Sequence, residues 1–258
     1  KLVRLRAELM QSAVPQGVGA MAAVLGLDDD QVQAICAQAA QGEVVEAVNF
    51  NSPGQVVIAG NVAAVERAMA AAKEAGAKRA LPLPVSVPSH CSLMKPAAEK
   101  LAEALQDVVI HTPQIRVIHN ADVAAYDDAD KIKDALVRQL YQPVRWVETA
   151  QKMAADGATV MAECGPGKVL VGLNKRIQHA GGKNAAHGTA LDHQRLWAIR
   201  RRTEALHYQS IPFCALMPAS KACLTFLTSL TVSANSRRAR WQPRPVMITC
   251  WEAGRCTR

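Results

Sequence analysis

The spacing of apolar residues predicts helices and strands over the first 177 residues of the chain. At the beginning, Leu2, Leu5, Leu9 and Met10 recur at the helical period of about 3.6 residues, which predicts a helix over residues 1–13. Pro15 and Gly17 end this helix, because proline and glycine interrupt helical backbone.

Residues 17–87 carry the pattern of a small unit of four strands and two helices. Apolar runs predict strands at 19–27, 44–50, 55–59 and 79–87, and helices at 28–40 and 62–75. Their β-α-β-β-α-β order is that of the split βαβ, or ferredoxin-like, arrangement. We therefore expect a ferredoxin-like small lobe.

The pattern changes after residue 87. Helices are predicted at 97–105, 129–140, 147–155 and 169–177, and buried strands at 115–119 and 159–163. Helices that alternate with single strands are typical of an α/β domain with a parallel sheet. The fold class is therefore α/β: residues 1–16 and 88–177 form part of a main domain into which the lobe is inserted.

Residues 178–258 differ from the rest of the chain. They hold twelve Lys or Arg against three Asp or Glu, so they account for the whole formal net charge of +8. They also contain four of the seven cysteines and three of the four tryptophans, without a sustained helical or strand period. We expect a tail of different origin, such as translation past a frameshift, with low order from about residue 180.

The composition excludes several classes of protein. Half of the residues are apolar, which is enough for a sizeable core. No apolar run approaches the roughly 18 residues of a membrane helix, and the charged first segment is not a signal peptide. The cysteines and histidines show neither a CxxC pair nor metal-ligand spacing, which favours a reducing, cytoplasmic compartment and no metal site.

Arg6 is the first candidate functional residue. On a helical wheel it points out of the centre of the apolar stripe, whereas Arg4 lies on the opposite face. A buried charge costs several kcal/mol unless it is paired, and the planar guanidinium suits a carboxylate held by two hydrogen bonds. A structural ion pair, or an arginine whose head reaches the surface, are the alternatives.

His90 is the second candidate. It follows the proline-rich segment 82–89, which places it at the junction of the lobe and the main domain, where clefts usually lie. Its imidazole could accept and return a proton, although a histidine satisfied at a strand end is the alternative. Cys91 is a weak candidate for a thiol nucleophile because adjacent residues rarely face each other. The segment Cys164-Gly165-Pro166-Gly167-Lys168 lacks phosphate-loop spacing, and no GxSxG motif occurs.

Several stretches together resemble one enzyme family. They are Met10-Gln11 with Ala13-Val14-Pro15, Gly19-Ala20-Met21-Ala22-Ala23-Val24-Leu25-Gly26-Leu27, Val48-Asn49-Phe50-Asn51-Ser52-Pro53-Gly54-Gln55-Val56-Val57-Ile58-Ala59-Gly60, Pro82-Leu83-Pro84-Val85-Ser86-Val87-Pro88-Ser89-His90-Cys91, and Gly165-Pro166-Gly167-Lys168-Val169-Leu170. In order and without large gaps, over residues 1 to about 177, they resemble the bacterial malonyl-CoA:acyl-carrier-protein transacylases.

This resemblance implies ping-pong transfer of malonyl from malonyl-CoA, through a serine ester, to the phosphopantetheine thiol of acyl carrier protein in fatty acid synthesis. It implies that His90 is the catalytic base, that Arg6 holds the malonyl carboxylate, and that the carbonyl of Gln139 orients the histidine. Asn49 and Asn51 match asparagines near the cleft. We expect a cytoplasmic monomer without cofactor, with His90 and an unpaired or solvent-bridged Arg6 in one cleft.

Two departures qualify the resemblance. The family's GHSxGE motif and the glutamine-bearing loop of its oxyanion hole would precede Lys1, so we expect the chain as written not to turn over. The family has only a short helical end after Ile177, whereas some eighty unrelated residues follow here. Both departures are typical of a gene fragment or a mispredicted reading frame.

Two other functions stay open. An acyltransferase domain of a polyketide synthase shares the chemistry, but the ending Pro88-Ser89-His90 and the lack of flanking synthase sequence favour the free-standing enzyme. A non-catalytic carrier-protein or nucleic-acid binding protein would use the basic tail, which lacks a recognisable module. We therefore expect no nucleic-acid and no membrane partner.

Overall fold

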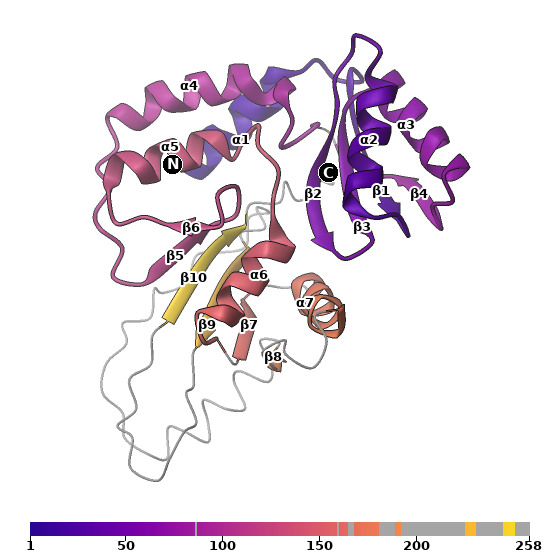
Figure 1. Ribbon diagram of the computed structural model, residues 1–258. Coiled ribbons are helices and arrows are strands. Elements are labelled where there is room, and N and C mark those ends of the chain that lie inside the picture. Colours follow the sequence, from indigo (N-terminus) through magenta and orange to yellow (C-terminus); the bar gives the residue numbers. More distant parts are fainter. Residues whose placement is uncertain are drawn as a thin grey trace.

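The computed structural model describes residues 1–85, 87–158, 160–164, 168–180, 189–191, 225–230 and 245–250. Within these residues a compact lobe of one sheet and two helices lies beside a larger part that contains a helical layer and a second sheet (Figure 1). Up to residue 180 the helices and strands follow the predicted order, apart from an additional short strand at Ala124–Ala125, which confirms the α/β class.

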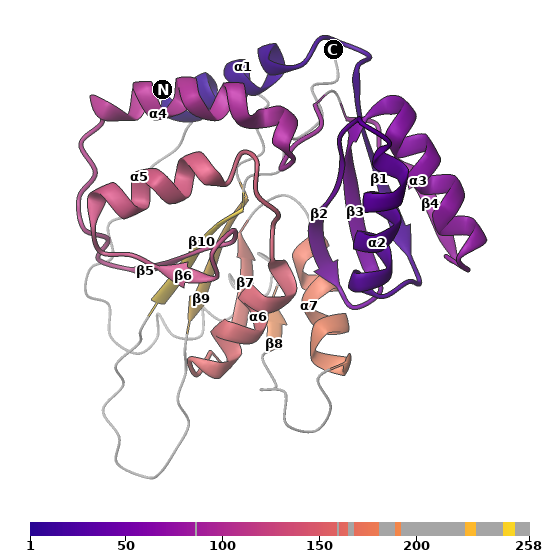
Figure 2. The ribbon, with the colours of Figure 1, turned by 45° about the horizontal axis from the view of Figure 1, so that its top comes forward.

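Three helices form the layer that carries the first candidate residue. They are α1 (Leu2–Ala13), α4 (Lys95–Gln106) and α5 (Ala129–Arg138). The helix α4 packs against both α1 and α5, and the three lie together when the molecule is turned (Figure 2). Their shared core includes Met10, Leu101, Leu105 and Leu140. The apolar stripe predicted for the first helix therefore faces α4.

The lobe has the topology expected from its sequence. It contains β1 (Gly19–Leu25), α2 (Asp29–Ala40), β2 (Val45–Ser52), β3 (Gln55–Asn61), α3 (Val62–Glu74) and β4 (Arg79–Pro82). The sheet order is β2-β3-β1-β4 with antiparallel neighbours, as two interleaved βαβ units require. The strand predicted over 79–87 ends early, at Pro82, because prolines cannot donate the backbone hydrogen bonds of a ladder.

The second sheet lies in the larger part. It contains β5 (Arg116–His119), β6 (Ala124–Ala125), β7 (Val160–Cys164), β8 (Thr189–Leu191), β9 (Thr225–Leu230) and β10 (Pro245–Cys250), in the order β6-β5-β10-β9-β7-β8. The helices α6 (Trp146–Ala155) and α7 (Val169–Ala180) share a core cluster with Ile118 of β5 and Met161 of β7.

This sheet differs from the predicted parallel one. The pairs β5–β10 and β7–β8 are parallel, whereas β9 pairs antiparallel with β7 and β10, and β5 pairs antiparallel with β6. The strands β8, β9 and β10 come from the segment in which no strand period was recognised. Without these strands, β5 and β7 would each have an unpaired edge. The strand β10 pairs with that edge of β5, and β9 pairs with that edge of β7. The predicted low order of the other residues after 180 lies outside the described residues.

The lobe is held against the larger part along β2. Phe50 donates its backbone N–H to the carbonyl of Val144 at 3.0 Å, and Val144 donates to Val48 at 2.8 Å. The helices α6 and α7 also contact β2, and Arg176 of α7 donates to Gln55 Oε1 at 2.7 Å. The strand β2 thus contacts helices of the lobe as well as helices of the larger part.

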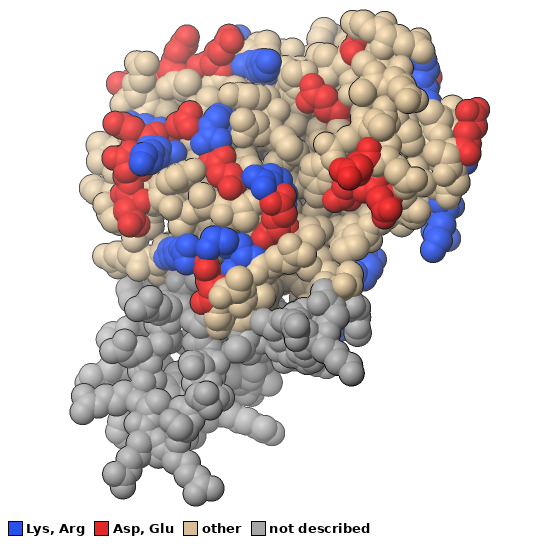
Figure 3. All heavy atoms as spheres, viewed as in Figure 1, with Lys and Arg blue, Asp and Glu red and all other residues tan. Residues whose placement is uncertain are grey.

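Surface charge on the described part is mixed. On the face shown in Figure 3, basic and acidic side chains are interspersed over α4, α5 and α6. Among the described helices, none is long and apolar enough to cross a membrane.

Candidate active site

His90 sits in a tight turn between β4 and the short helix η1 (Ser92–Met94). Its backbone φ is +67°, the left-handed region that non-glycine residues seldom adopt and that is often found at functional sites. The turn is fixed from the main domain, because the backbone N–H of His90 donates to the carbonyl of Leu140 at 3.0 Å. The residue is 4% exposed.

The imidazole of His90 is held in one tautomer. Its Nδ1 lies 2.7 Å from the carbonyl oxygen of Gln139, and a carbonyl can only accept, so Nδ1 carries the hydrogen and Nε2 keeps its lone pair. Burial, followed by the charge of Arg6, lowers the pKa of His90 to about 4, although the Gln139 carbonyl opposes this shift. The ring is therefore neutral at pH 7, with Nε2 able to accept a proton.

Arg6 occupies the position that the helical wheel predicted. It is 7% exposed on the inner face of α1, while Arg4 is exposed on the outer face. Its Nη2 donates to Oε1 of Gln139 at 3.5 Å, a long and therefore weak bond. The prediction of an unpaired guanidinium is wrong, because the side-chain oxygen of Gln139 accepts a hydrogen bond from it.

Gln139 joins the two candidates. It follows α5 as its C-terminal cap and is 4% exposed. Its backbone carbonyl accepts from His90, its side-chain oxygen accepts from Arg6, and its Nε2 donates to Oδ1 of Asn120 at 2.8 Å. Arg6 precedes Gln139 by 133 residues and His90 precedes it by 49, and both contact it. The family resemblance implied that all three belong to one site, and the structure brings them together.

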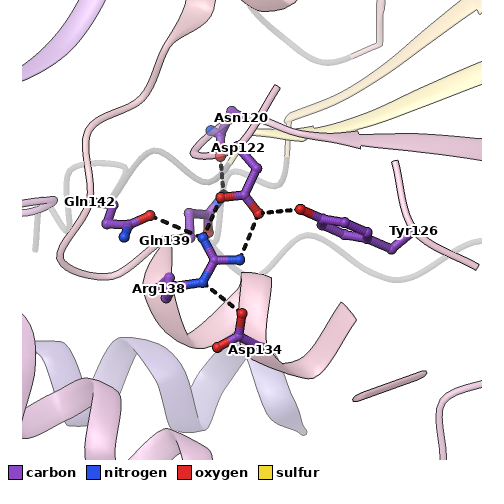
Figure 4. A network of polar contacts seen from close by, with 7 residues as sticks. All are labelled: Asn120, Asp122, Tyr126, Asp134, Arg138, Gln139 and Gln142. Atoms are coloured by element: carbon purple, nitrogen blue, oxygen red, sulfur yellow. Dashed lines mark hydrogen bonds and ion pairs between the residues drawn. The ribbon is translucent and has the colours of Figure 1, made fainter. Parts of the chain in front are cut away.

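A charged network supports the same end of α5 (Figure 4). Arg138, next to Gln139, forms two hydrogen bonds with the carboxylate of Asp122, one of them at 2.7 Å, and a third with Asp134. Tyr126 donates to the same Asp122 at 3.1 Å. The Arg138 hydrogen bonds lower the pKa of Asp122, which keeps the pair ionised at neutral pH. The loop that follows β5 is thereby tied to the residue beside Gln139.

Three residues of this network were not predicted from the sequence: Asn120, Asp122 and Arg138. A signal for the first was present, since His119 and Asn120 are polar residues at the carboxyl end of a predicted buried strand, where α/β proteins often place their sites. No pattern linked this loop to Gln139, because the two lie 19 residues apart in sequence.

The asparagines lie on the lobe side. Asn49 is buried in β2, where its backbone forms a bridge with Val144, five residues after Gln139. Asn51 is partly buried near the end of the same strand. In the described part of the chain, no hydrogen bond joins the side chain of Asn49 or Asn51 to His90, so their role stays a prediction.

The residues that follow His90 are anchored to the lobe. The carboxylate of Glu46, in β2, accepts from the backbone N–H of Ser92 at 3.1 Å and from its hydroxyl at 2.6 Å. The turn is therefore held from both sides: Leu140 and Gln139 hold it from the main domain, and Glu46 holds it from the lobe.

Cys91 lacks the properties of a thiol nucleophile. The Sγ of Cys91 is buried and donates to the carbonyl of Pro88 at 3.1 Å, and burial raises its pKa to about 12, so the reactive thiolate is absent at neutral pH. Among the residues that the structure describes, no group of three or more His, Cys, Asp or Glu could hold a metal ion. Residues 165–167 of the segment that lacks phosphate-loop spacing lie outside the described residues.

Curated relatives share much of this sequence. The malonyl CoA-acyl carrier protein transacylase of Haemophilus influenzae is 66% identical over 177 residues, which are 69% of this chain and 57% of the relative. The Escherichia coli K12 protein of the same name is 60% identical over the same shares. The chain thus spans 57% of the length of these relatives. Both relatives are named for acyl transfer.

Solved structures agree with the fold. An acyl carrier protein S-malonyltransferase from Vibrio cholerae is 59% identical with a TM-score of 0.71, covering 77% of this chain and 63% of that one. A malonyl-transacylase in complex with a type II PKS acyl carrier protein is 52% identical with a TM-score of 0.73, over 78% and 64% of the two chains. The family model described as the acyl transferase domain matches residues 1–196, some twenty residues beyond the boundary drawn from sequence. The chain belongs to the acyl transferase domain family.

Proposed function

We propose that the protein to which this chain belongs transfers a malonyl group from malonyl-CoA to the phosphopantetheine thiol of acyl carrier protein, in cytoplasmic fatty acid synthesis. The observation that carries the proposal is the meeting of His90 and Arg6 on Gln139, at 2.7 Å and 3.5 Å. A neutral base with a free Nε2 and a buried cation side by side suit a reaction in which a nucleophile is deprotonated next to a bound carboxylate.

In the proposed reaction His90 moves one proton in each half. A serine hydroxyl attacks the thioester carbonyl of malonyl-CoA while Nε2 of His90 takes its proton, which passes to the departing coenzyme A thiolate. The carrier-protein thiol then attacks the serine ester, His90 takes the thiol proton, and the serine leaves with it. The Gln139 carbonyl stabilises the imidazolium that forms in each half, because it accepts from Nδ1.

Arg6 would supply the preference for malonyl. Its bond to Gln139 is long, so a carboxylate can replace or supplement it with two short charge-assisted bonds. Since the charge of Arg6 contributes to the low pKa of His90, a bound carboxylate also makes the histidine a stronger base. Acetyl-CoA has no carboxylate and gains neither effect.

The remaining roles belong to the same proposal. Asn49 and Asn51 contribute the lobe side of the substrate site. Acyl transfer through a serine ester requires no metal or redox cofactor, because the thioester itself carries the reactive acyl group. The enzyme acts as a monomer on its two substrates.

The test measures malonyl and acetyl transfer by Arg6→Ala. Because the family's serine motif is expected before Lys1, activity is assayed on the chain extended at Lys1 by the corresponding segment of the Haemophilus influenzae relative. Loss of one charge-assisted pair should lower kcat/KM for malonyl-CoA about ten- to a hundredfold. Acetyl transfer should stay the same or improve.

The exposed Arg4→Ala variant on the same helix is the matched control and should leave both rates unchanged. Calorimetry on the unextended chain adds a test without turnover, in which malonate binds more tightly than acetate only while Arg6 is present. Equal losses for both acyl groups in Arg6→Ala would assign Arg6 a purely structural role. Absence of malonyl transfer in the extended protein would refute the proposed function.

A further inference from the structure

The side-chain amide of Gln139 can point in only one direction. Arg6 has hydrogen-bond donors and no acceptor, so the end of the amide that faces it must be oxygen. The opposite end is then the NH2 group, which lies 2.8 Å from Asn120 Oδ1. The groups therefore follow one another in the order Arg6 guanidinium, Gln139 amide oxygen, Gln139 amide nitrogen and Asn120 side-chain oxygen.

Asn120 is placed to hold the amide in that direction, because its side-chain oxygen accepts from Gln139 Nε2. It is 1% exposed and directly follows β5, and its backbone carbonyl accepts from the N–H of Arg145 at 2.9 Å. Asp122, two residues after Asn120, accepts hydrogen bonds from the side chain of Arg138, the residue that precedes Gln139 (Figure 4). The loop therefore has one contact with the Arg138 side chain at the end of α5 and a separate one with the Gln139 amide.

Without that second contact, Gln139 Nε2 loses its acceptor, and among the described side chains only the 3.5 Å bond to Arg6 still holds the amide. The amide can then rotate out of line and weaken that bond, so the guanidinium is less well oriented. The backbone carbonyl of Gln139, which holds His90, does not depend on the side-chain amide. Losing the Asn120 acceptor should thus disturb Arg6 and leave the His90–Gln139 bond in place.

We propose that Asn120 is a positioning residue that selects for malonyl, by holding the Gln139 amide so that its oxygen orients Arg6. The inference rests on the proposed function, because it assigns Arg6 the malonyl carboxylate. Asn120 acts through its contact with the Gln139 amide, so its proposed role is positioning rather than catalysis.

The test replaces Asn120 by leucine, which has nearly the same shape and no acceptor, and by alanine in case the leucine variant does not fold. In the extended protein, loss of one neutral hydrogen bond should lower the malonyl-to-acetyl ratio of kcat/KM about three- to tenfold, through KM for malonyl-CoA. By contrast, kcat should change little, since the His90–Gln139 bond is retained. Calorimetry on the unextended chain should show weaker malonate binding and unchanged acetate binding.

Asp122→Asn is the matched control in the same loop. It weakens the grip on Arg138 without touching the Gln139 amide, so it should lower stability and leave the malonyl-to-acetyl ratio within about twofold of the original. An unchanged ratio in both Asn120 variants, or an equal change in Asp122→Asn, overturns the inference while malonyl transfer by the unaltered protein still supports the function. No malonyl transfer by the unaltered protein refutes both.

Discussion

Acid should destabilise this protein through His90, and His90→Gln should remove that part of the effect. The imidazole is 4% exposed, and its pKa falls from 6.5 to about 4 on folding. Between these two pH values His90 is protonated in the unfolded chain and neutral in the folded protein. The free energy of unfolding therefore falls as the pH drops from 6.5 to 4, and no loss from His90 occurs above pH 6.5. Glutamine keeps a hydrogen-bonding side chain at the site without a titrating ring.

The size of the effect follows from the two pKa values. At about 1.4 kcal/mol for each pH unit, the interval from 6.5 to 4 corresponds to a loss of about 3 kcal/mol. His119, whose pKa burial also lowers, destabilises the fold in the same direction. The relevant quantity is therefore the difference between the unaltered chain and His90→Gln at each pH, in which the His119 contribution cancels.

Urea unfolding of the full chain, followed by far-ultraviolet circular dichroism at half-unit steps from pH 7.5 to 4, measures this difference. The two free-energy curves should converge by about 3 kcal/mol as the pH falls. The exposed His111→Gln variant is the control and should run parallel to the unaltered chain. Parallel curves for His90→Gln as well would refute a neutral, buried His90 and with it the tautomer assigned from Gln139.

Two further predictions concern substitutions in the lobe. Glu46→Gln leaves one acceptor for the two donors of Ser92, so kcat of the extended protein should fall about threefold to tenfold with little change in KM. The control Glu43→Gln, at a glutamate paired on the surface, should be neutral. An unaltered kcat in Glu46→Gln would show that the contact between Glu46 and Ser92 does not position His90. Gly60→Ala should destabilise the fold by about 1–3 kcal/mol or more, because its Cβ would lie 1.9 Å from the backbone oxygen of Val44. Gly172→Ala, in a helix with open space around it, should instead stabilise by about 0.5–1 kcal/mol, and equal unfolding midpoints for the two glycine variants would contradict this account.

The first 177 residues determine their own secondary structure closely. The stripe from Leu2 to Met10, the interleaved strands and helices of the lobe, and the end of the lobe at a proline-rich segment are local patterns, so they could be recognised without any partner. The same locality made Arg6 stand out, because a single turn of helix is enough to place a charge in an apolar stripe.

The resemblance supplied what periodicity could not. Nothing about the spacing of His90 or Gln139 indicates that they touch, and their pairing with Arg6 was expected only because the motifs matched a known family. Contacts across 49 and 133 residues depend on how α1, α5 and the lobe junction pack, which no local period encodes.

Only the tertiary structure revealed the support for the site and the composition of the second sheet. The loop from Asn120 to Asp122 meets α5 because both lie at the carboxyl end of β5, and the direction of the Gln139 amide follows from a row of donors and acceptors drawn from three separate segments. The strands β9 and β10 pair with β7 and β5. Strand pairing depends on which edges are available in space, and a weak strand period in the sequence gives no information about those edges.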